Sequence, residues 1–433
     1  MTPAARLSAA IEVLADIEAQ RRPAAQALKD WGLSHRFAGS GDRAAIAGLV
    51  YDALRRRSSA AWIMGVDTPR AVLLGMLARD RSLAVEAISK LASGARFAPE
   101  PLSDEEHARL RAKSLEGAPP HILGDYPEWL DDKLAASFGD ERAEEAEALA
   151  SRAPLDLRAN TLKATREEAV EELAEYAPQP ARWSPWGLRI EITADSKAPA
   201  IHAEPAFLKG QIEIQDEGSQ LAALFAGAKP GEQVVDLCAG AGGKTLALAA
   251  VMENKGQIFA TDTDKRRLAP IHERLQRADA HNVQVRTPRG EKDALAGLEG
   301  RADLVLIDAP CTGTGAWRRN PDAKWRVRPG ALAERLKDQA ETLDSAAPLV
   351  KPAGRIAYVT CSVLEEENGA QVRAFLARHA GFSIEPPADV TNALGERAFL
   401  FRRAVLMSDE GLLMTPRRTG TDGFFVSVLR RRA

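Results

Sequence analysis

Two of the three cysteines in this chain follow strand-like apolar runs. Cys311 comes just after the run at 302–307, and Cys361 comes just after the run at 355–359. Ligands bind at the carboxyl ends of the strands in an open parallel sheet, so we expect both thiols at one binding edge. A cysteine with thiolate character is a nucleophile, and this pattern indicates covalent chemistry.

A glycine-rich loop at 238–245 separates a strand-like run from an expected helix. Glycines let the backbone approach a ligand, and the start of the helix offers free N–H groups. A phosphate-binding P-loop fails here, because its first glycine is replaced by Cys238. A dinucleotide fingerprint is weak, because its third glycine is Thr245. S-adenosylmethionine (SAM) remains, although the loop alone is also compatible with a plain strand-to-helix turn.

A carboxylate and two thiols near such a loop match the needs of cytosine methylation. A thiolate that adds to C6 of cytosine makes C5 nucleophilic, and C5 then attacks an electrophilic methyl group. The reaction needs a nucleophilic cysteine, an acid near the ring and help in elimination; Cys361, Asp308 and Cys311 supply these groups. Asp262, after the next strand, suits a ribose diol, but this alone does not separate SAM from NAD. The alternative for any single cysteine is packing as a small apolar residue, which we expect for Cys238.

The composition is that of a globular protein in a reducing compartment. The chain has 433 residues, 45% of them hydrophobic and 27% charged, with a net charge of −3. This length predicts two or three domains. The sequence shows no membrane span, secretory signal or metal-type cysteine spacing, so we expect a cytoplasmic protein, monomeric and without a metal. Local basic clusters keep RNA binding possible despite the acidic balance.

The pattern of apolar residues predicts three regions. Residues 1–140 have helical periodicity and form an expected all-α domain. Residues 141–215 mix short strands with a helix and form an expected small α/β subdomain. Residues 216–433 alternate strands and helices, which predicts a doubly wound, parallel, Rossmann-like sheet. The expected strands of this last region are 233–237, 257–261, 283–286, 304–307, 355–359 and 424–429, and its expected helices are 244–252, 265–278, 331–346 and 366–379.

The stretch from about Gln215 to Val428 resembles the SAM-dependent RNA cytosine-C5 methyltransferase family, in its RsmB-like form. The strings that carry the resemblance are Gln215-Asp216-Glu217-Gly218-Ser219-Gln220, Asp236 through Thr245, Asp308 through Gly315, Arg318 through Trp325, Thr360-Cys361-Ser362-Val363-Leu364 with Glu366-Glu367-Asn368, and Asp422-Gly423-Phe424-Phe425. The string from Leu157 to Lys163 matches the family's small subdomain. The strings 43–51 and 54–56 resemble the helical NusB-like RNA-binding domain that precedes the catalytic module.

The resemblance implies a role for each matching residue. It makes Cys361 the nucleophile, makes Cys311 the group that assists product release, and places Asp308 between the cofactor and the target base. The implied cofactor-binding residues are Cys238, Ala239, Gly240, Ala241, Gly242, Gly243, Lys244, Asp262, Arg267 and Asp308.

The chain departs from the family at two places near the cofactor. Gly240-Ala241 stands where the family has Ala-Pro, and the permissive glycine should preserve the turn. Arg289 falls where the family has an acid on the adenine side. Either Glu291 or Asp293 substitutes for that acid, or SAM is held differently.

The resemblance implies methylation of C5 of a cytosine in RNA, with 16S rRNA as the first expectation. We expect Arg318, Arg319 and Lys324, with basic residues of the N-terminal region, to hold RNA phosphates. The alternatives are the same chemistry on tRNA or another RNA, and an RNA-binding scaffold with a degenerate SAM site. A DNA cytosine methyltransferase is a further alternative, against which the Thr360-Cys361-Ser362 string argues.

Overall fold

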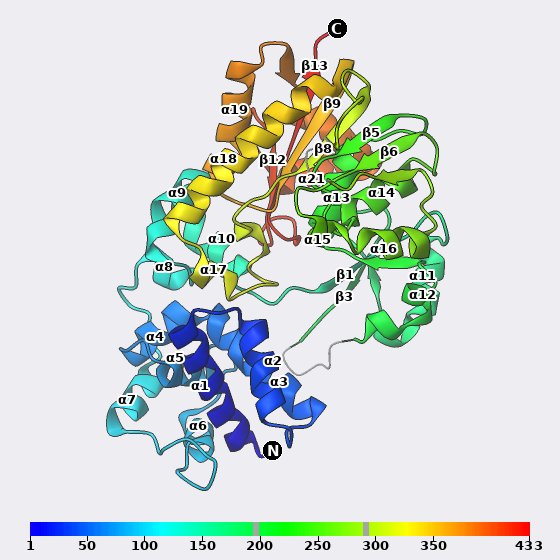
Figure 1. Cartoon of the computed structure of the whole chain (residues 1–433). Helices are drawn as coiled ribbons and strands as arrows, with labels where there is room; N and C mark the ends of the chain where they lie inside the picture. Colours follow the sequence, from blue (N-terminus) through cyan, green and yellow to red (C-terminus); the bar gives the residue numbers. More distant parts are fainter. Residues whose placement is uncertain (194–198, 289–293) are drawn as a thin grey trace. The chain divides into compact units, whose positions relative to one another are not determined.

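The computed structural model describes residues 1–193, 199–288 and 294–433. The chain divides into two compact units, whose elements are labelled in Figure 1. Unit 1 comprises residues 1–151 and 317–328, and unit 2 comprises residues 152–316 and 329–433. Arg289, Glu291 and Asp293, on which the expectation about adenine rests, lie outside the described residues. Within the described ranges, no helix combines the length and the apolar character that crossing a membrane requires.

Unit 1 is helical, as its periodicity predicts. Thr2 and Pro3 begin the first helix, where the Thr2 hydroxyl accepts a hydrogen bond from the Ala5 N–H. One continuous apolar core joins helices α1 to α7, and α5 has eight successive buried residues. The helices are α1 Pro3–Gln20, α2 Ala24–Ser34, α3 Ser40–Arg55, α4 Arg57–Met64, α5 Pro69–Arg79, α6 Val85–Leu91, α7 Asp104–Ala112, α8 Pro120–Leu123, α9 Asp131–Phe138 and α10 Arg142–Leu149.

The segment 317–328, which contains the short helix α17 (Ala323–Arg326), packs within unit 1. Lys324 Nζ donates a hydrogen bond to the Arg55 carbonyl oxygen at 2.8 Å. Trp325 Nε1 donates to the Leu54 carbonyl oxygen at 2.7 Å. The pKa of Lys324 is lowered to about 7, mainly by burial; Asp125 opposes this shift, and the neighbouring arginines add to it.

This packing corrects one expectation from the sequence. Arg318 and Lys324 are 3% and 1% exposed, so neither side chain presents its charge to a phosphate. Arg55, another basic residue of the N-terminal region, donates to the carbonyl oxygens of Ser151 and Arg318. The prediction that Arg318 and Lys324 hold RNA phosphates is therefore wrong. The segment 317–328 is rich in polar residues, but these two side chains are buried in the fold.

Unit 2 begins with a small antiparallel sheet. Its strands are β1 Leu155–Ala159, β2 Gln179–Pro180, β3 Gly187–Ile190 and β4 Ile212–Ile214, in the spatial order β2-β3-β1-β4. The helices α11 (Arg166–Glu172) and α12 (Pro205–Leu208) complete an apolar core of its own.

The large sheet of unit 2 contains all six strands that the sequence predicts there. The strands β5 Gln233–Asp236, β6 Gln257–Ala260, β7 Val283–Val285, β8 Ala302–Asp308 and β9 Val350–Thr360 are parallel, and β13 Phe424–Arg431 runs antiparallel to β9. The spatial order is β11-β12-β13-β9-β8-β5-β6-β7, with β11 Leu406–Met407 and β12 Leu412–Met414 at one edge and β10 Phe382–Ile384 paired to β13.

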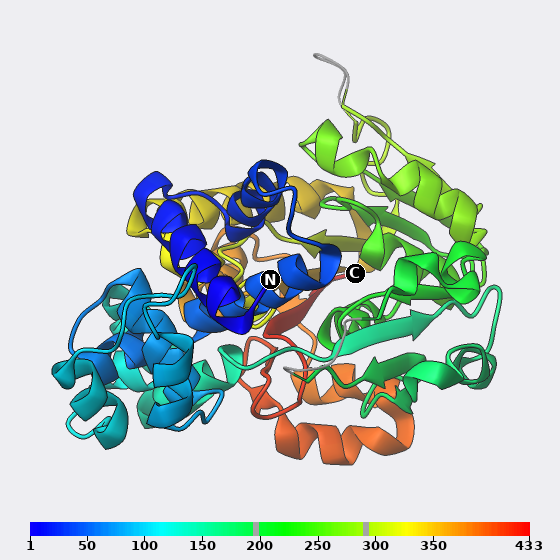
Figure 2. The same cartoon turned by 90° about the horizontal axis from the view of Figure 1, so that it is seen from below.

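Helices cover both faces of this sheet (Figure 1, Figure 2). Successive residues of β8 alternate between two apolar cores, with Leu304 and Leu306 in one and Val305 and Ile307 in the other. The first core includes residues of α13 (Glu217–Phe225), α14 (Gly243–Val251) and α21 (Ala398–Ala404), and the second includes residues of α18 (Pro329–Ala346) and α19 (Gly369–Arg378). The doubly wound, Rossmann-like fold is confirmed.

One expected helix, at 265–278, is interrupted in the structure. It forms α15 (Lys265–Leu268) and α16 (Ile271–Ala278), with Pro270 between them. Proline has no N–H to donate and clashes with the preceding turn, which explains the break.

Candidate active site

The thiols of Cys311 and Cys361 lie together at the carboxyl edge of the large sheet. Strands β8 and β9 are neighbours, with Asp308 in register with Val359, so the loops that follow them meet. The two Sγ atoms are 3.3 Å apart, and both side chains are half-buried. Two thiols fifty positions apart in sequence thus lie side by side.

Hydrogen bonds fix the two cysteine loops to each other. The Gly315 N–H donates to the Cys361 carbonyl oxygen at 2.9 Å. The Val363 N–H donates to Thr314 Oγ1 at 2.9 Å, and the Thr314 and Ser362 hydroxyls are 3.0 Å apart. These bonds set the position of one thiol relative to the other before a substrate arrives.

Two buried residues, Glu367 and Gln339, hold the loop that carries Cys311. Glu367 Oε1 accepts a hydrogen bond from the Thr312 N–H at 2.8 Å, and Glu367 Oε2 accepts one from the Thr312 hydroxyl at 2.5 Å. Gln339 Nε2 donates to Glu367 Oε1 at 3.0 Å and to the Pro310 carbonyl oxygen at 2.9 Å.

Sequence reasoning noted Glu367 only as part of a string and missed Gln339. A signal was present, because Gln339 lies on the face of α18 that also carries Leu332 and Leu343. A polar side chain on a buried helical face needs a hydrogen-bond partner, and here the partner is the active-site loop.

The surroundings of the Cys311 thiol hold its pKa well above the ordinary value. The hydrogen bond with Cys361 is the largest cause, and burial and the charge of Glu367 add to the effect. The two Sγ atoms lie within hydrogen-bond distance, and either thiol can act as the donor.

Asp308 and Lys244 form an ion pair at the same edge. Lys244 Nζ lies 2.8 Å from Asp308 Oδ2 and 5.0 Å from the centroid of the Phe424 ring. The Asp308 side chain is 36% exposed, whereas Lys244 is 7% exposed. The pair therefore joins the first turn of α14 to the end of β8 and presents a carboxylate at the surface of the site.

The glycine loop after β5 has the backbone shape that the sequence suggests. Gly240 and Gly242 have φ values of +50° and +84°, in the left-handed region that favours glycine. A Cβ atom at Gly242 would lie 2.5 Å from Ile271 Cγ1, so this position also needs glycine for its close packing on α16. The substitution of glycine for the family's alanine at 240 suits the observed turn.

Asp262 holds the glycine loop through a backbone hydrogen bond. Its Oδ2 accepts a hydrogen bond from the Gly240 N–H at 3.0 Å, and its Oδ1 accepts one from the Asp264 N–H at 2.9 Å. Each carboxylate oxygen has a further lone pair, so Asp262 retains acceptors for a ribose diol. Arg267 is more than half exposed, with its guanidinium 3.9 Å from Asp262.

Asp236, at the end of β5, is buried, and Cys238, at the start of the loop, is half-buried. Asp236 accepts a hydrogen bond from the Thr245 hydroxyl at 2.7 Å, and burial raises its pKa to about 7. Burial also raises the pKa of the Cys238 thiol, and Cys238 packs against an apolar core. The unreactive role expected for Cys238 agrees with this environment.

The residues of the loop fit SAM by the chemistry that they offer. Left-handed glycines bring the backbone close to a ligand, α14 begins at Gly243 with its N–H groups free to donate, and Asp262 is placed for hydroxyl groups. Within the described residues no group of His, Cys, Asp and Glu is arranged to hold a metal ion.

Comparison with known proteins gives matches in sequence and structure. Residues 223–430 match the family described as 16S rRNA methyltransferase RsmB/F. Residues 126–196 match a ferredoxin-like domain described for RsmF/B-like methyltransferases.

Curated relatives extend the sequence match. A probable ribosomal RNA small subunit methyltransferase B of Synechocystis is 32% identical over 314 residues, covering 71% of this chain and 67% of the relative. The counterpart in Bacillus subtilis is 32% identical over 308 residues, covering 71% of this chain and 66% of the relative. The match to the enzyme of Salmonella arizonae, 36% identical, spans 58% of each chain.

A solved structure resembles the whole chain. The crystal structure of PH0851 covers 100% of this chain and 99% of its own, with a TM-score of 0.70 and 28% sequence identity. A methyltransferase homologue from Pyrococcus horikoshii covers 72% of this chain, with a TM-score of 0.57 and 27% identity. SAM is the cofactor of proteins of this kind. From these matches, together with the thiol pair and the glycine loop, the chain belongs to the RsmB/F family of 16S rRNA methyltransferases.

Proposed function

We propose that this protein transfers a methyl group from SAM to C5 of a cytosine in RNA, with 16S rRNA as the substrate. The observation that carries the proposal is the pair of thiols, 3.3 Å apart, at the same sheet edge as the Asp308–Lys244 pair and the glycine loop. The names of the curated relatives, which are ribosomal RNA small subunit methyltransferases, support the choice of RNA.

The first step is the attack of Cys361 on the base. The target cytosine must leave any stack to reach a half-buried thiol. Cys361 Sγ forms a bond to C6, and the electron pair of the C5–C6 double bond becomes available at C5. SAM supplies the electrophilic methyl group that C5 takes up. Asp308 presents its carboxylate to the polar edge of the ring, and Lys244 balances its charge.

Product release depends on Cys311. Once Cys361 Sγ is bonded to C6, the hydrogen bond between the two thiols, which is the chief cause of the raised pKa of Cys311, is broken. Cys311 then releases its proton to solvent, and its thiolate removes the proton from C5. The electron pair re-forms the C5–C6 double bond and expels Cys361 as a thiolate. The step restores both cysteines and releases one proton for each methyl group transferred.

The test compares Cys361→Ala with Cys311→Ala on 16S rRNA, tRNA and DNA, using labelled SAM. We expect Cys361→Ala to abolish transfer and to form no adduct. We expect Cys311→Ala to methylate once and to accumulate a covalent RNA–protein complex, visible on a denaturing gel. Normal turnover by Cys361→Ala contradicts the mechanism, and an adduct formed through Cys311 on DNA favours a DNA methyltransferase. Failure of the wild type to bind SAM in calorimetry favours a non-catalytic scaffold.

A further inference from the structure

Unit 2 has a basic groove formed by α21 and the turn before β3. Its cavity has a volume of about 320 Å³. The lining residues are Arg182, Trp183, Arg397, Leu400, Arg403 and Ala404. Three of the six are arginines and none is acidic, so the groove is suited to an anion.

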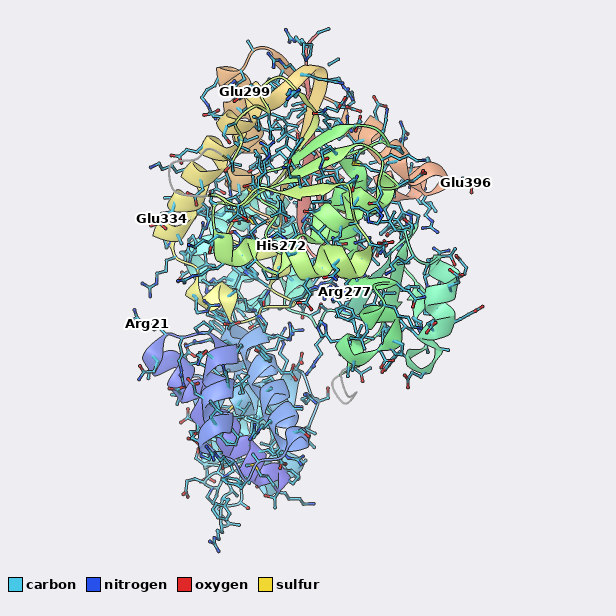
Figure 3. All side chains as sticks on the ribbon, turned by 45° about the vertical axis from the view of Figure 1, so that its right-hand side comes forward. Arg21, His272, Arg277, Glu299, Glu334 and Glu396 are labelled. Carbon is cyan, nitrogen blue, oxygen red and sulfur yellow. The ribbon has the colours of Figure 1, made fainter. Side chains whose placement is uncertain are left out.

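Two of these arginines are available to a ligand. Arg182 and Arg403 are exposed, and neither has a carboxylate partner among the described residues. The Arg182 guanidinium lies 4.4 Å from the centroid of the Trp183 ring, and that of Arg403 lies 6.0 Å from the centroid of the Phe399 ring. Glu396, the neighbour of Arg397 in the chain, is exposed (labelled in Figure 3) and is not among the residues that line the groove.

The third arginine builds the wall of the groove. Arg397 Nη1 donates hydrogen bonds to the carbonyl oxygens of Trp183 and Ser184, at 3.0 and 3.3 Å. The groove is therefore held by bonds between elements far apart in sequence, and its shape does not depend on a ligand.

The helix α21 presents apolar side chains beside these charges. Phe399 and Leu400 are 66% and 60% exposed. The opposite face of the helix is anchored, because Phe401 is fully buried, 5.2 Å from the Trp183 ring in an edge-to-face arrangement. An exposed aromatic ring next to unpaired arginines is the combination with which proteins bind single-stranded nucleic acid.

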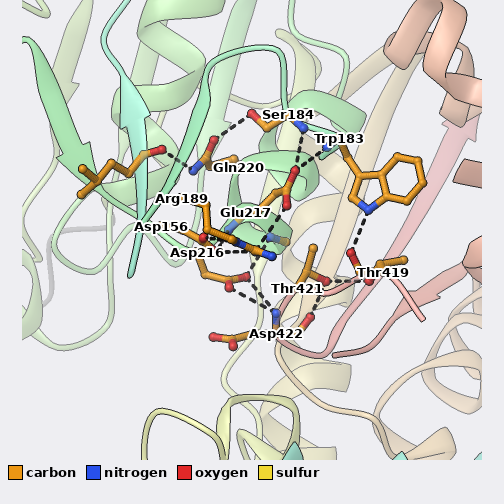
Figure 4. Close-up of polar contacts among 12 residues, drawn as sticks. Asp156, Trp183, Ser184, Arg189, Asp216, Glu217, Gln220, Thr419, Thr421 and Asp422 are labelled. Carbon is orange, nitrogen blue, oxygen red and sulfur yellow. Dashed lines mark hydrogen bonds and ion pairs between the residues drawn. The ribbon is translucent and has the colours of Figure 1, made fainter. Parts of the chain in front are cut away.

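A continuous set of hydrogen bonds begins at the wall of this groove (Figure 4). The N–H groups of Trp183 and Ser184 donate to the buried carboxylate of Glu217, and Trp183 Nε1 donates to the Thr419 carbonyl oxygen at 2.8 Å. Three residues beyond Thr419, the Asp422 N–H donates to Asp216.

The same framework reaches the nucleophile. The Gly423 N–H donates to the Gly315 carbonyl oxygen at 2.8 Å, and the Gly315 N–H donates to the Cys361 carbonyl oxygen. The same series of hydrogen bonds thus connects the groove to the backbone of Cys361. Such a connection is expected of a surface that binds the substrate.

We propose that this groove binds a single-stranded segment of the RNA substrate that flanks the target cytosine. Arg182 and Arg403 hold backbone phosphates, and a base stacks on Phe399. This inference rests on the proposed function. A second copy of the chain is the other occupant to consider, but a symmetric contact would place the same arginines against each other.

The experiment measures binding of a fluorescent single-stranded RNA oligonucleotide to the full chain over a series of salt concentrations. We expect Arg182→Ala/Arg403→Ala to weaken binding about tenfold or more and to reduce the salt slope by about 1.4, or about 0.7 for each lost phosphate contact. We expect Phe399→Ala to weaken binding roughly tenfold with the slope unchanged. The matched control is Arg301→Ala/Arg335→Ala, which removes the same charge from exposed positions outside the groove.

Further measurements separate this proposal from the proposed function. In methylation assays we expect the double variant to raise KM for RNA while kcat and SAM binding are unchanged. Unchanged RNA affinity and slope, or an equal loss in the control, would overturn the proposal. So would a wild-type dimer that the double variant dissociates without loss of RNA binding. If the wild type methylates no RNA, the proposed function fails, while the binding series still decides on the groove.

Discussion

Two lysines, Lys244 in the first turn of α14 and Lys324 in the segment 317–328, are buried in different ways. Lys244 is 7% exposed and lies 2.8 Å from the carboxylate of Asp308. Lys324 is 1% exposed and donates to an uncharged acceptor, the carbonyl oxygen of Arg55. Burial lowers the pKa of Lys324 to about 7, so near neutral pH this side chain is partly uncharged.

The difference teaches that a basic residue in a shared string does not by itself mark a contact with RNA or cofactor. The surroundings of Lys244 supply an opposite charge at the edge where the thiols lie. The surroundings of Lys324 supply packing and one hydrogen bond, which hold the segment 317–328 within unit 1. One lysine is thus suited to chemistry and the other to structure.

The largest expected effect comes from Lys244→Met. The variant removes the ammonium group that balances Asp308, so we expect kcat/KM for methyl transfer to fall by about 10²- to 10³-fold. Lys324→Met is the matched variant in the other region, and we expect it to change kcat/KM by less than about threefold. Steady-state assays with labelled SAM measure both. Equal losses of kcat/KM in the two variants would contradict the assignment of a chemical role to Lys244 and a structural role to Lys324.

The second expected effect concerns stability. Lys324→Ala deletes the buried stem and leaves a cavity, so we expect it to lower the free energy of unfolding by about 2–4 kcal/mol. Lys324→Met keeps most of the stem and removes the buried amine, so we expect a change within about 1 kcal/mol. Urea denaturation followed by circular dichroism provides both values. A Met variant as unstable as the Ala variant would mean that the hydrogen bond to Arg55, and not packing, holds the segment.

The sequence predicts the large sheet because strands such as β8 are continuous apolar runs between helices of regular period. It also places Cys311 and Cys361 at strand ends, and parallel pairing then brings them together. It could not show that Lys324 is buried, because its hydrogen-bond acceptor, the Arg55 carbonyl oxygen, is distant in the chain. The same holds for Gln339, whose partner Glu367 lies in another element.

The sequence could not predict the groove on unit 2 either, because its residues are also distant from one another in the chain. Arg182 and Arg403 are separated by more than two hundred residues, so no local cluster of basic residues in the sequence contains both. Local sequence patterns indicate helices, strands and turns. Whether a charged side chain is available to a ligand depends on the other elements that surround it in the fold.

The third expected effect is a dependence of stability on pH. The folded pKa of Lys324, about 7, lies below the unfolded value of about 10.4, so between these values the unfolded state binds more protons. The contribution of Lys324 to stability therefore rises as the pH increases from about 7 towards 10, by at most about 1.4 kcal/mol per pH unit. Urea denaturation at pH 7, 8 and 9 measures it, and Lys324→Met should flatten the profile. A profile that is the same in both proteins would assign the dependence to other groups.

The smallest expected effect concerns the cysteines. We expect Cys238 to contribute to packing, as Lys324 does, and Cys361 to take part in chemistry, as Lys244 does. Burial raises the pKa of the Cys238 thiol, and the side chain packs on an apolar core beside the cofactor loop. We expect Cys238→Ala to lower stability by about 1 kcal/mol and to change kcat by less than about threefold, because alanine preserves the backbone of the glycine loop. The assay is methyl transfer at saturating SAM and RNA, with calorimetry for SAM affinity. A loss of kcat as large as that of Cys311→Ala would show that the third thiol takes part in the reaction, and the assignment of its role to packing would fall.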